Sequence, residues 1–256
     1  MAVINNDTQI SKIEKELDQA RSMLMNPMIL NPFARDFSLR FCWSSNAIEG
    51  NTLDLEETVS VIEYDEVKSG HTYTEYQEAK NLYRAICEQM IPFQKRQITE
   101  QWIKAANGLI LGRKNDYRTN PVYIGTLVEA VYYPPEAEKV PGLMEDFVRE
   151  NSAWENSLTD CPVKVVLQKI AEFHMQFEQI HPFQDGNGRA GRMILNQQLI
   201  NQGLIPLCIG PRGKYRQAFR QYEKNQDLSL MVYTLCKGEL DSIQLIQDLT
   251  ANYNGK

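Results

Sequence analysis

The stretch His181-Pro-Phe-Gln-Asp-Gly-Asn-Gly-Arg-Ala-Gly-Arg192 decides how the rest of this sequence is interpreted. Its centre, Asp185-Gly-Asn-Gly188, contains two glycines, which can adopt positive φ and whose backbone amides no side chain covers. From Arg189 onward apolar residues recur at helical spacing, so the loop leads into a helix. The first amides of a helix and its dipole favour a phosphate group. The sequence therefore predicts an anion-binding loop at a helix N-terminus.

The charged side chains of this segment extend the prediction to a polyphosphate site. Arg189 and Arg192 supply charge-assisted donors from neighbouring positions of the helix. Asp185 supplies a hard oxygen of the kind that Mg²⁺ prefers when phosphate and water provide its other ligands. His181 can titrate near neutral pH and accept the proton of an incoming hydroxyl. The string Asp-Gly-Asn-Gly alone is typical of an ordinary turn, but here a base, a metal ligand and a phosphate loop adjoin.

Helical periodicity predominates along the rest of the chain, so we expect a mainly α fold. One helix is expected between an N-cap at Thr99 and a stop at Gly112, and another opens after Pro162 and runs to the motif. The exceptions are the β-branched and aromatic runs 121–125 and 130–133, which predict a β-hairpin.

Several prolines predict where helices break. Asn26-Pro27 and Asn31-Pro32 are expected to interrupt helices, and Pro92 to end a helix that begins near Thr74. A final helix is expected over roughly Leu240 to Tyr253. We expect an N-terminal helical region over residues 1–95 and a core over residues 96–256, joined as subdomains without a flexible linker.

Composition limits the classes of function. The 256 residues are 43% hydrophobic and 23% charged, with a net charge of −6, which argues against broad binding to nucleic acid. The five cysteines include no C-x-x-C pair and are expected to be reduced thiols. Because no stretch has the length and apolarity of a signal peptide or membrane span, a cytoplasmic protein without a membrane partner is expected.

The motif matches H-P-F-x-[D/E]-G-N-G-R-x-x-R at every defined position, and the chain resembles the Fic family over roughly residues 45–235. The resemblance implies a Fic-type helical bundle with a small β-hairpin flap and an N-terminal helical layer. It also implies that His181 deprotonates a Ser, Thr or Tyr hydroxyl of a target protein, which attacks the α-phosphate of ATP. Phe183 would be buried and would orient the loop.

By the same resemblance, Mg²⁺ would bind Asp185, the α- and β-phosphates would bind residues 186–188, and the distal phosphates would bind the two arginines. The implied nucleotide-binding residues are Asp185, Gly186, Asn187, Gly188, Arg189, Ala190, Gly191 and Arg192. Positioning and charge stabilisation are what phosphoryl chemistry requires of a protein, so these residue types suit the reaction.

A second match is the stretch Ser45-Asn-Ala-Ile-Glu49-Gly-Asn51, which fits the family's inhibitory pattern [S/T]-x-x-x-E-[G/N]. Taken alone, it describes a helix that ends at Gly50, with Glu49 in solvent. Beside a Fic core, the resemblance implies that Glu49 pairs with Arg192 and keeps it from the γ-phosphate. The chain would then be autoinhibited, with Ser45, Glu49, Gly50 and Asn51 as the inhibitory residues.

Two further groups are assigned by resemblance. Val122, Tyr123, Ile124 and Gly125, within the stretch Arg118–Gly125, match the flap that aligns the target by main-chain pairing; the alternative is an ordinary surface hairpin. Tyr215 and Tyr222 are candidate walls of the adenine pocket, and the alternative is that both belong to the core.

The other histidines point away from a zinc enzyme. His174 lies on the apolar face of its helix and is expected to be a hydrogen-bonded core residue, and His71 is expected in a loop. There is no H-E-x-x-H pattern.

The leading hypothesis is therefore an autoinhibited protein adenylyltransferase that uses ATP and Mg²⁺. The intact Gly188 disfavours the kinase activity of Doc-like relatives. Transfer of another phosphate-containing group, removal of AMP, and a nucleotide-binding module with vestigial chemistry stay open as alternatives. The expected partner is a protein substrate, which includes the chain itself; a homodimer is a further alternative.

Overall fold

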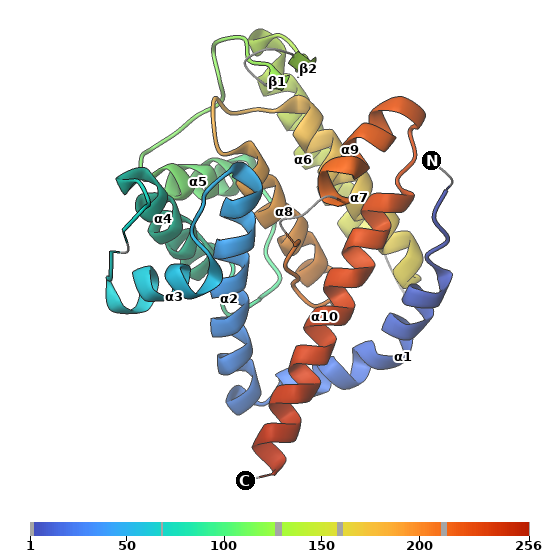
Figure 1. The fold of residues 1–256 in the computed structure, drawn as a ribbon. Coiled ribbons are helices and arrows are strands. Elements are labelled where there is room, and N and C mark those ends of the chain that lie inside the picture. Colours follow the sequence, from blue (N-terminus) through green and yellow to red (C-terminus); the bar gives the residue numbers. More distant parts are fainter. Residues whose placement is uncertain (1–2, 68, 126–129, 158–160, 211–213, 256) are drawn as a thin grey trace.

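A computed structural model of the protein describes residues 3–67, 69–125, 130–157, 161–210 and 214–255. Within these ranges the chain forms ten α-helices, one short 3-10 helix and one pair of strands (Figure 1). In chain order the elements are α1 (Asp7–Leu24), α2 (Pro27–Glu49), α3 (Leu55–Tyr64), α4 (Tyr73–Gln89), α5 (Glu100–Leu111), β1 (Ile124–Gly125), β2 (Ala130–Tyr132), the 3-10 helix Ala137–Lys139, α6 (Val140–Ser157), α7 (Val163–Ile180), α8 (Asn187–Asn201), α9 (Lys214–Asn225) and α10 (Ser229–Asn254). The expected mainly α fold is confirmed.

Helix α8 lies at the centre of the bundle, where it packs against α7, α5 and α2 (Figure 1). Nearly all of its residues are buried, including polar side chains such as Asn196, Gln197 and Gln198. The N-terminal helix α1 packs along α10, so the two ends of the chain cover the same side of the molecule. Helix α2 crosses between α4 and α10 and reaches α8 at its C-terminal end. This crossing brings an N-terminal segment to the 181–192 motif.

Several helix boundaries follow from local capping, as the sequence predicted. Asn26 caps α2 by accepting a hydrogen bond from the Met28 amide at 3.0 Å, and Pro27 occupies the first helical position. Thr99 caps α5 in the same way through the Trp102 amide at 3.1 Å, and α5 ends at Gly112. These boundaries require no partner from elsewhere in the chain.

Two expected boundaries are wrong because tertiary packing overrides a local signal. Pro32 lies inside α2 instead of ending it; a proline in a helix costs roughly 3 kcal/mol, which burial of Phe33 and Phe37 on the same helix offsets. The final helix begins at Ser229, well before the expected Leu240. It continues through Gly238, where a Cβ would lie 2.9 Å from Leu207 Cδ1, so the glycine marks a close contact and not a helix end.

The expected hairpin region contains two short antiparallel strands, with Ile124 opposite Tyr132 and an irregularity before Gly125 pairs with Ala130. The paired segments are shorter than the predicted runs, and the connecting residues 126–129 lie outside the described ranges. The role of this hairpin as a flap stays a prediction.

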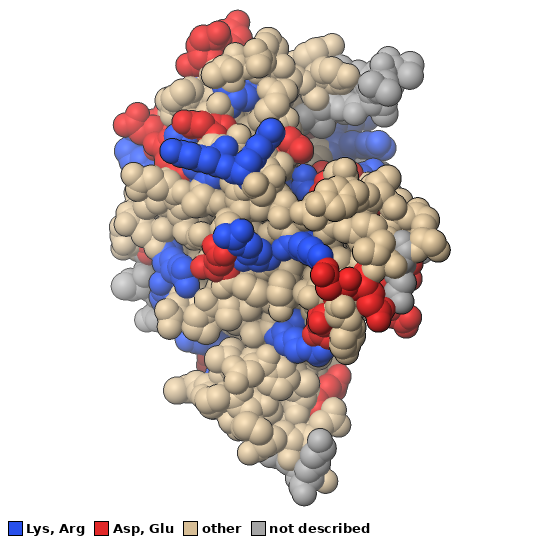
Figure 2. All heavy atoms as spheres, turned by 90° about the vertical axis from the view of Figure 1, so that its left-hand side faces the viewer, with Lys and Arg blue, Asp and Glu red and all other residues tan. Residues whose placement is uncertain are grey.

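Buried apolar side chains from both sides of residue 95, such as Phe41 and Phe177, belong to one hydrophobic core. The expected division into residues 1–95 and 96–256 stays a prediction. All five cysteines are free thiols. In the described part of the chain, no helix combines the length and apolarity needed to cross a membrane. Figure 2 shows acidic and basic side chains interspersed on one face of the molecule.

Candidate active site

His181 ends helix α7 in a left-handed conformation, with φ 49° and ψ 61°. Its amide donates to the Phe177 carbonyl at 3.0 Å, and Pro182 prevents the helix from continuing. The imidazole is partly buried, and burial lowers its pKa; the Glu178 main chain opposes this shift, and the Arg118 cation adds to it. The ring is therefore neutral near pH 7, which is the form that accepts a proton.

The loop after His181 is closed by Asn187. Its Oδ1 accepts from the Phe183 amide and its Nδ2 donates to the Phe183 carbonyl, both at 2.8 Å. Phe183 is fully buried, as expected, and its ring contacts Tyr117. The side chain of Asn187 is therefore engaged in shaping the loop, and only its backbone amide is left for an anion.

Helix α8 begins directly after this loop. Gly186 is its N-cap, with φ 77°, where a side chain would be strained and a Cβ would lie 2.8 Å from Asn107 Nδ2. The neighbouring Asp185 side chain is 64% exposed and accepts from the Gly186 amide at 2.6 Å. The N-terminus of α8 thus combines backbone amides with an accessible carboxylate.

Arg192, one turn into α8, is 2% exposed and is held mainly by α2. Its Nη2 lies 2.6 Å from Glu49 Oε1 and 2.9 Å from the Ser45 carbonyl, and its Nε donates to Ser45 Oγ at 2.8 Å. Burial opposes both charges, but the attraction within the pair wins: the pKa of Glu49 is lowered and that of Arg192 is raised. The contact implied by the resemblance is present.

Gly188 permits this contact by lacking a side chain. A Cβ at this position would lie 2.3 Å from Glu49 Oε1 and 3.0 Å from Arg192 Nη1. Unlike Gly186, Gly188 lies in the first turn of α8 without positive φ. Its requirement for glycine is therefore the space that the Glu49 carboxylate occupies.

Arg189 is held by a different helix of the N-terminal layer. Its Nη1 lies 3.0 Å from Glu78 Oε1 on α4, and its Nη2 lies 3.5 Å from Asp185 Oδ1. The other oxygen of Glu78 accepts from Asn51 Nδ2 at 3.0 Å. Because Asn51 directly follows the C-cap Gly50 of α2, Glu78 connects the segment after Glu49 to the motif.

Beneath Arg192 lies a second set of buried polar groups. The Tyr215 hydroxyl lies 2.7 Å from His174 Nε2 and 3.4 Å from Arg192 Nη1, so His174 is the hydrogen-bonded core residue that was expected. Burial lowers the pKa of His174 to about 3, and it raises that of Glu178 to about 8. Both are therefore neutral near pH 7, and Arg192 stands among uncharged groups on this side.

The remaining expected site residues lie in several places. Ala190 is buried, and a Cβ on Gly191 would meet α7, so both face the bundle. Tyr215 is buried under Arg192, and Tyr222 packs half-buried on α9. Val122 and Tyr123 precede β1, which is formed by Ile124 and Gly125. Their assigned roles, and those of the other motif residues, stay predictions.

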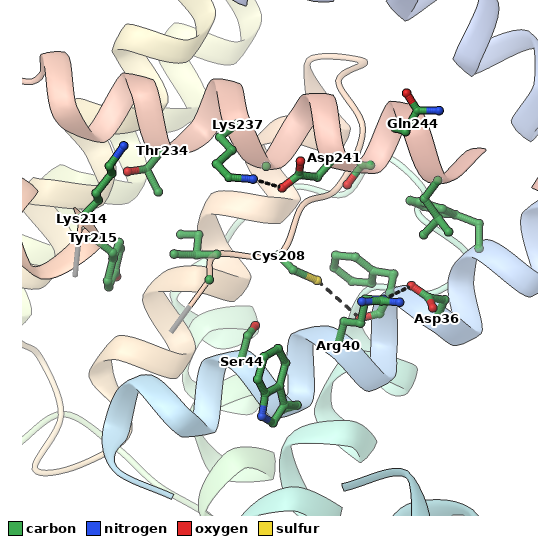
Figure 3. A pocket seen from close by; sticks show the side chains of 18 of the residues that line it. Asp36, Arg40, Ser44, Cys208, Lys214, Tyr215, Thr234, Lys237, Asp241 and Gln244 are labelled. Atoms are coloured by element: carbon green, nitrogen blue, oxygen red, sulfur yellow. Dashed lines mark hydrogen bonds and ion pairs between the residues drawn. The ribbon is translucent and has the colours of Figure 1, made fainter. Parts of the chain in front are cut away.

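A cavity of about 590 Å³ lies apart from the motif, between α2 and α10 (Figure 3). Its floor includes Cys208, and Ser44 and Lys237 line opposite sides. Among the expected site residues, Tyr215 contributes to its lining, whereas no residue of 181–192 does so. The chemistry of the motif is therefore not located in this cavity.

The sequence did not predict a functional role for three polar residues at the site. Arg118 binds the main chain around His181, Glu78 binds Arg189, and the partly buried Glu178 lies beside Gly191 of α8. Arg118 carried one usable signal, because it is the only charged residue between Asp116 and Glu129. The two glutamates lie in ordinary amphipathic helices, and nothing local distinguishes them.

The protein-family comparison matches residues 97–199 to the Fic/DOC family. The chain is 24% identical over 209 residues to a protein named protein adenylyltransferase Fic from Nematostella vectensis, covering 78% of this chain and 46% of that protein. It is 39% identical over 95 residues to a probable protein adenylyltransferase from Aquifex aeolicus, covering 37% and 28% of the two chains. The chain thus spans less than half the length of these curated relatives.

The fold agrees with the family match. The structure of a Fic-domain-containing signalling protein from Bacteroides thetaiotaomicron superposes with a TM-score of 0.82 at 22% identity, over 95% of this chain and 97% of that one. The chain therefore has the same fold as this Fic-domain structure. Within this fold, the match to the Fic/DOC family covers residues 97–199.

Proposed function

We propose that this chain transfers AMP from ATP to a hydroxyl group of a protein, and that Glu49 restrains the reaction. The main support for the proposal is the order of chemical groups at the junction between α7 and α8. A neutral histidine, an exposed carboxylate, a helix N-terminus and two buried arginines follow one another there. The relatives' names, which refer to longer proteins, support the same activity.

In the proposed reaction, proton transfer and phosphate binding fall to different residues. His181 accepts the proton of the attacking hydroxyl, a step worth about 10² to 10⁴ in rate. The first amides of α8 bind the phosphates near the attacked phosphorus, and Arg189 and Arg192 bind the distal phosphates and stabilise the charge on the departing pyrophosphate.

The donor set fits Mg²⁺ through a single protein ligand. Asp185 offers a largely exposed carboxylate, and the described residues contain no group of three or more His, Cys, Asp or Glu side chains that could enclose a metal. The ligands of Mg²⁺ would then be Asp185, phosphate oxygens and water, and the bound ion would neutralise phosphate charge.

The restraint follows from competition for one guanidinium group. Glu49 and Ser45 occupy three of the five N–H donors of Arg192, and the Glu49 carboxylate would repel a γ-phosphate oxygen that approaches the same guanidinium. Glu49 is 37% exposed, whereas Arg192 is 2% exposed. Because Glu49 ends α2 at the edge of the site, a change at this helix end can release the arginine without unfolding the core.

The test is self-labelling with ATP that carries the label on either the α- or the γ-phosphate. We expect Glu49→Gly to raise labelling from α-labelled ATP roughly tenfold or more, because one charge-assisted contact is worth about 1.5–3 kcal/mol. Adding His181→Ala should abolish the signal. Glu56→Gly is the matched control, since Glu56 is an exposed glutamate in the first turn of α3, and it should leave labelling unchanged.

The two labels distinguish AMP transfer from the alternative functions. Transfer of the γ-label without the α-label by the Glu49→Gly variant contradicts AMP transfer and indicates a kinase. ATP binding without transfer of either label indicates a nucleotide-binding module. Release of AMP from a labelled protein, in place of its attachment, indicates the reverse reaction.

A further inference from the structure

Arg118 is a buried arginine whose charge has no ion-pair partner within the described residues. It is 4% exposed, and burial lowers its pKa. A guanidinium removed from water must have its donors satisfied, and among the described residues Arg118 finds its acceptors in main-chain carbonyls. The identity of those carbonyls indicates what the residue does.

Three of the contacts are made to consecutive residues at the end of α7. The Nε of Arg118 donates to the His181 carbonyl at 2.8 Å, its Nη2 lies 3.4 Å from the Ile180 carbonyl, and its backbone amide donates to the Pro182 carbonyl at 2.9 Å. The last carbonyls of a helix lack helical partners and carry the negative end of its dipole. Arg118 therefore satisfies and neutralises the helix end from which His181 projects.

The backbone of His181 needs such support. Its left-handed conformation costs a non-glycine residue roughly 1–3 kcal/mol and persists where neighbouring groups enforce it. The Phe177 carbonyl fixes its amide, and Arg118 fixes its carbonyl. Both sides of the residue are thereby held, and with them the direction in which the imidazole leaves the chain.

The same guanidinium reaches the base of the hairpin. Its Nη1 donates to the Asn120 carbonyl at 3.3 Å, and its Nη2 donates to the Pro135 carbonyl. These residues flank the segment that contains β1 and β2. One side chain therefore joins three main-chain segments: the start of the hairpin, its end, and the residue proposed as the base.

We infer that Arg118 is a positioning residue, which holds the His181 main chain and the hairpin base in one fixed arrangement. This inference rests on the proposed function, in which His181 is the base. The geometry explains why an arginine is required: a planar group with five donors can contact several carbonyls at once, whereas a lysine ammonium at the end of a flexible chain cannot reproduce that set.

The first experiment measures the rate of self-labelling in the Glu49→Gly background. Arg118→Lys keeps the charge but not the fork of donors, so we expect the maximal rate to fall about tenfold or more with the KM for ATP unchanged, as a misplaced catalytic group can cost ~10² in rate. Arg113→Met, an exposed arginine nearby, should have no effect. A rate for Arg118→Lys within about twofold of the parent overturns the inference.

The second experiment does not depend on activity. The three histidine rings are titrated by NMR without Mg²⁺, with the His181 signal assigned by its loss in His181→Ala. Arg118, Glu49 and Asp185 act on the charge of this ring, so Arg118→Met should raise the pKa of His181, whereas Arg118→Lys should leave it near the parent value. The His174 ring should not change in either variant.

The two experiments separate the possible failures. If Glu49→Gly does not label at all, the proposed function is wrong, and the titration still tests whether Arg118 acts on His181. An unchanged His181 pKa in Arg118→Met contradicts that action. If Arg118→Met does not fold, Arg118→Lys decides by its rate: a tenfold fall supports the inference, and an unchanged rate overturns it.

Discussion

The surroundings of Arg192 and Arg189 differ, although the two arginines lie on the same helix and both are buried. Arg192 is held by Glu49 and by two oxygens of Ser45, all from α2. Arg189 is held by Glu78 from α4, with Asp185 at a longer distance. The first arrangement surrounds the guanidinium on several sides, whereas the second leaves the Nε of Arg189 buried without a partner among the described residues.

Under the proposed function, this difference distinguishes an arginine that would be restrained from one that would be oriented. Glu49 lies where the glycine at position 188 leaves room, at the N-terminus of α8, so under the proposed function it would compete with an incoming anion. Glu78 approaches Arg189 from α4 and also binds Asn51, so it acts as a fixed support. Removal of Glu49 should therefore free Arg192 for binding, and removal of Glu78 should leave Arg189 less well oriented.

The largest expected effect comes from breaking the Arg192 arrangement with Gly188→Ala. The new methyl group would overlap Glu49 Oε1 and separate the pair, so the free energy of unfolding should fall by about 1–2 kcal/mol after the gain in helix propensity is included. Chemical denaturation measures this change. In Glu49→Gly the same substitution should cost less, and the double-mutant cycle gives the coupling.

Gly142→Ala in α6 is the control for this cycle, because a Cβ at Gly142 has open space around it. It should be neutral or stabilising by up to about 1 kcal/mol. Equal costs for Gly188→Ala with and without Glu49 would contradict the assignment of this space to the carboxylate.

A smaller effect is expected from breaking the Arg189 arrangement with Glu78→Gln. The substitution removes the charge that faces a buried guanidinium, and we expect a loss of about 1 kcal/mol in the free energy of unfolding. In the Glu49→Gly background, labelling should fall by a few-fold, since Arg189 is less well oriented. Glu88→Gln in the same helix removes an exposed pair with Arg84 and should change stability by less than about 0.5 kcal/mol. If Glu78→Gln instead raises labelling, Glu78 is a second restraint.

The smallest effect concerns the titration of Glu178. Burial raises its pKa to about 8, Arg192 lowers it and Glu49 raises it. An acid with a raised pKa in the folded state makes stability fall as the pH rises from its unfolded pKa toward 8. Glu49→Gln removes the repulsive carboxylate, so the pKa of Glu178 should fall by less than about one unit, and the loss of stability on that side should shrink.

Carboxyl NMR measures this shift, with Glu178→Gln providing the assignment. Glu78→Gln is the matched control, since Glu78 does not act on Glu178 in the way that Glu49 does. Equal shifts in the two variants would show that the surroundings of Arg189 and Arg192 are one electrostatic unit, and would remove the distinction drawn between them.

The sequence was sufficient for features whose causes lie within a few residues. The end of α7 at His181 follows from the proline after it, and the start of α8 follows from Gly186 and the helical spacing beyond. The order base, carboxylate, glycine loop and arginines could likewise be read directly. The errors at Pro32 and at the start of α10 arose where burial outweighed a local signal.

Contacts between distant residues divide into two kinds. Resemblance to a family implied the pairing of Glu49 with Arg192, 143 residues away, and the structure places the two in contact. The pairing of Glu78 with Arg189, 111 residues apart, had no local pattern to indicate it, and the isolated charge of Arg118 did not indicate its contact with His181, 63 residues away. These two contacts form only when the helices pack against one another.

By itself, then, the sequence determined the chemical groups of the 181–192 motif, their order and the helix end on which they lie, because capping, proline and glycine act over a single turn. Only the tertiary structure decided which groups contact those residues: Glu49 of α2 pairs with Arg192, Glu78 of α4 pairs with Arg189, and Arg118 donates to the His181 carbonyl. The physical reason is that a buried charge must find its partners, and the partners that packing brings within reach are set by the whole fold.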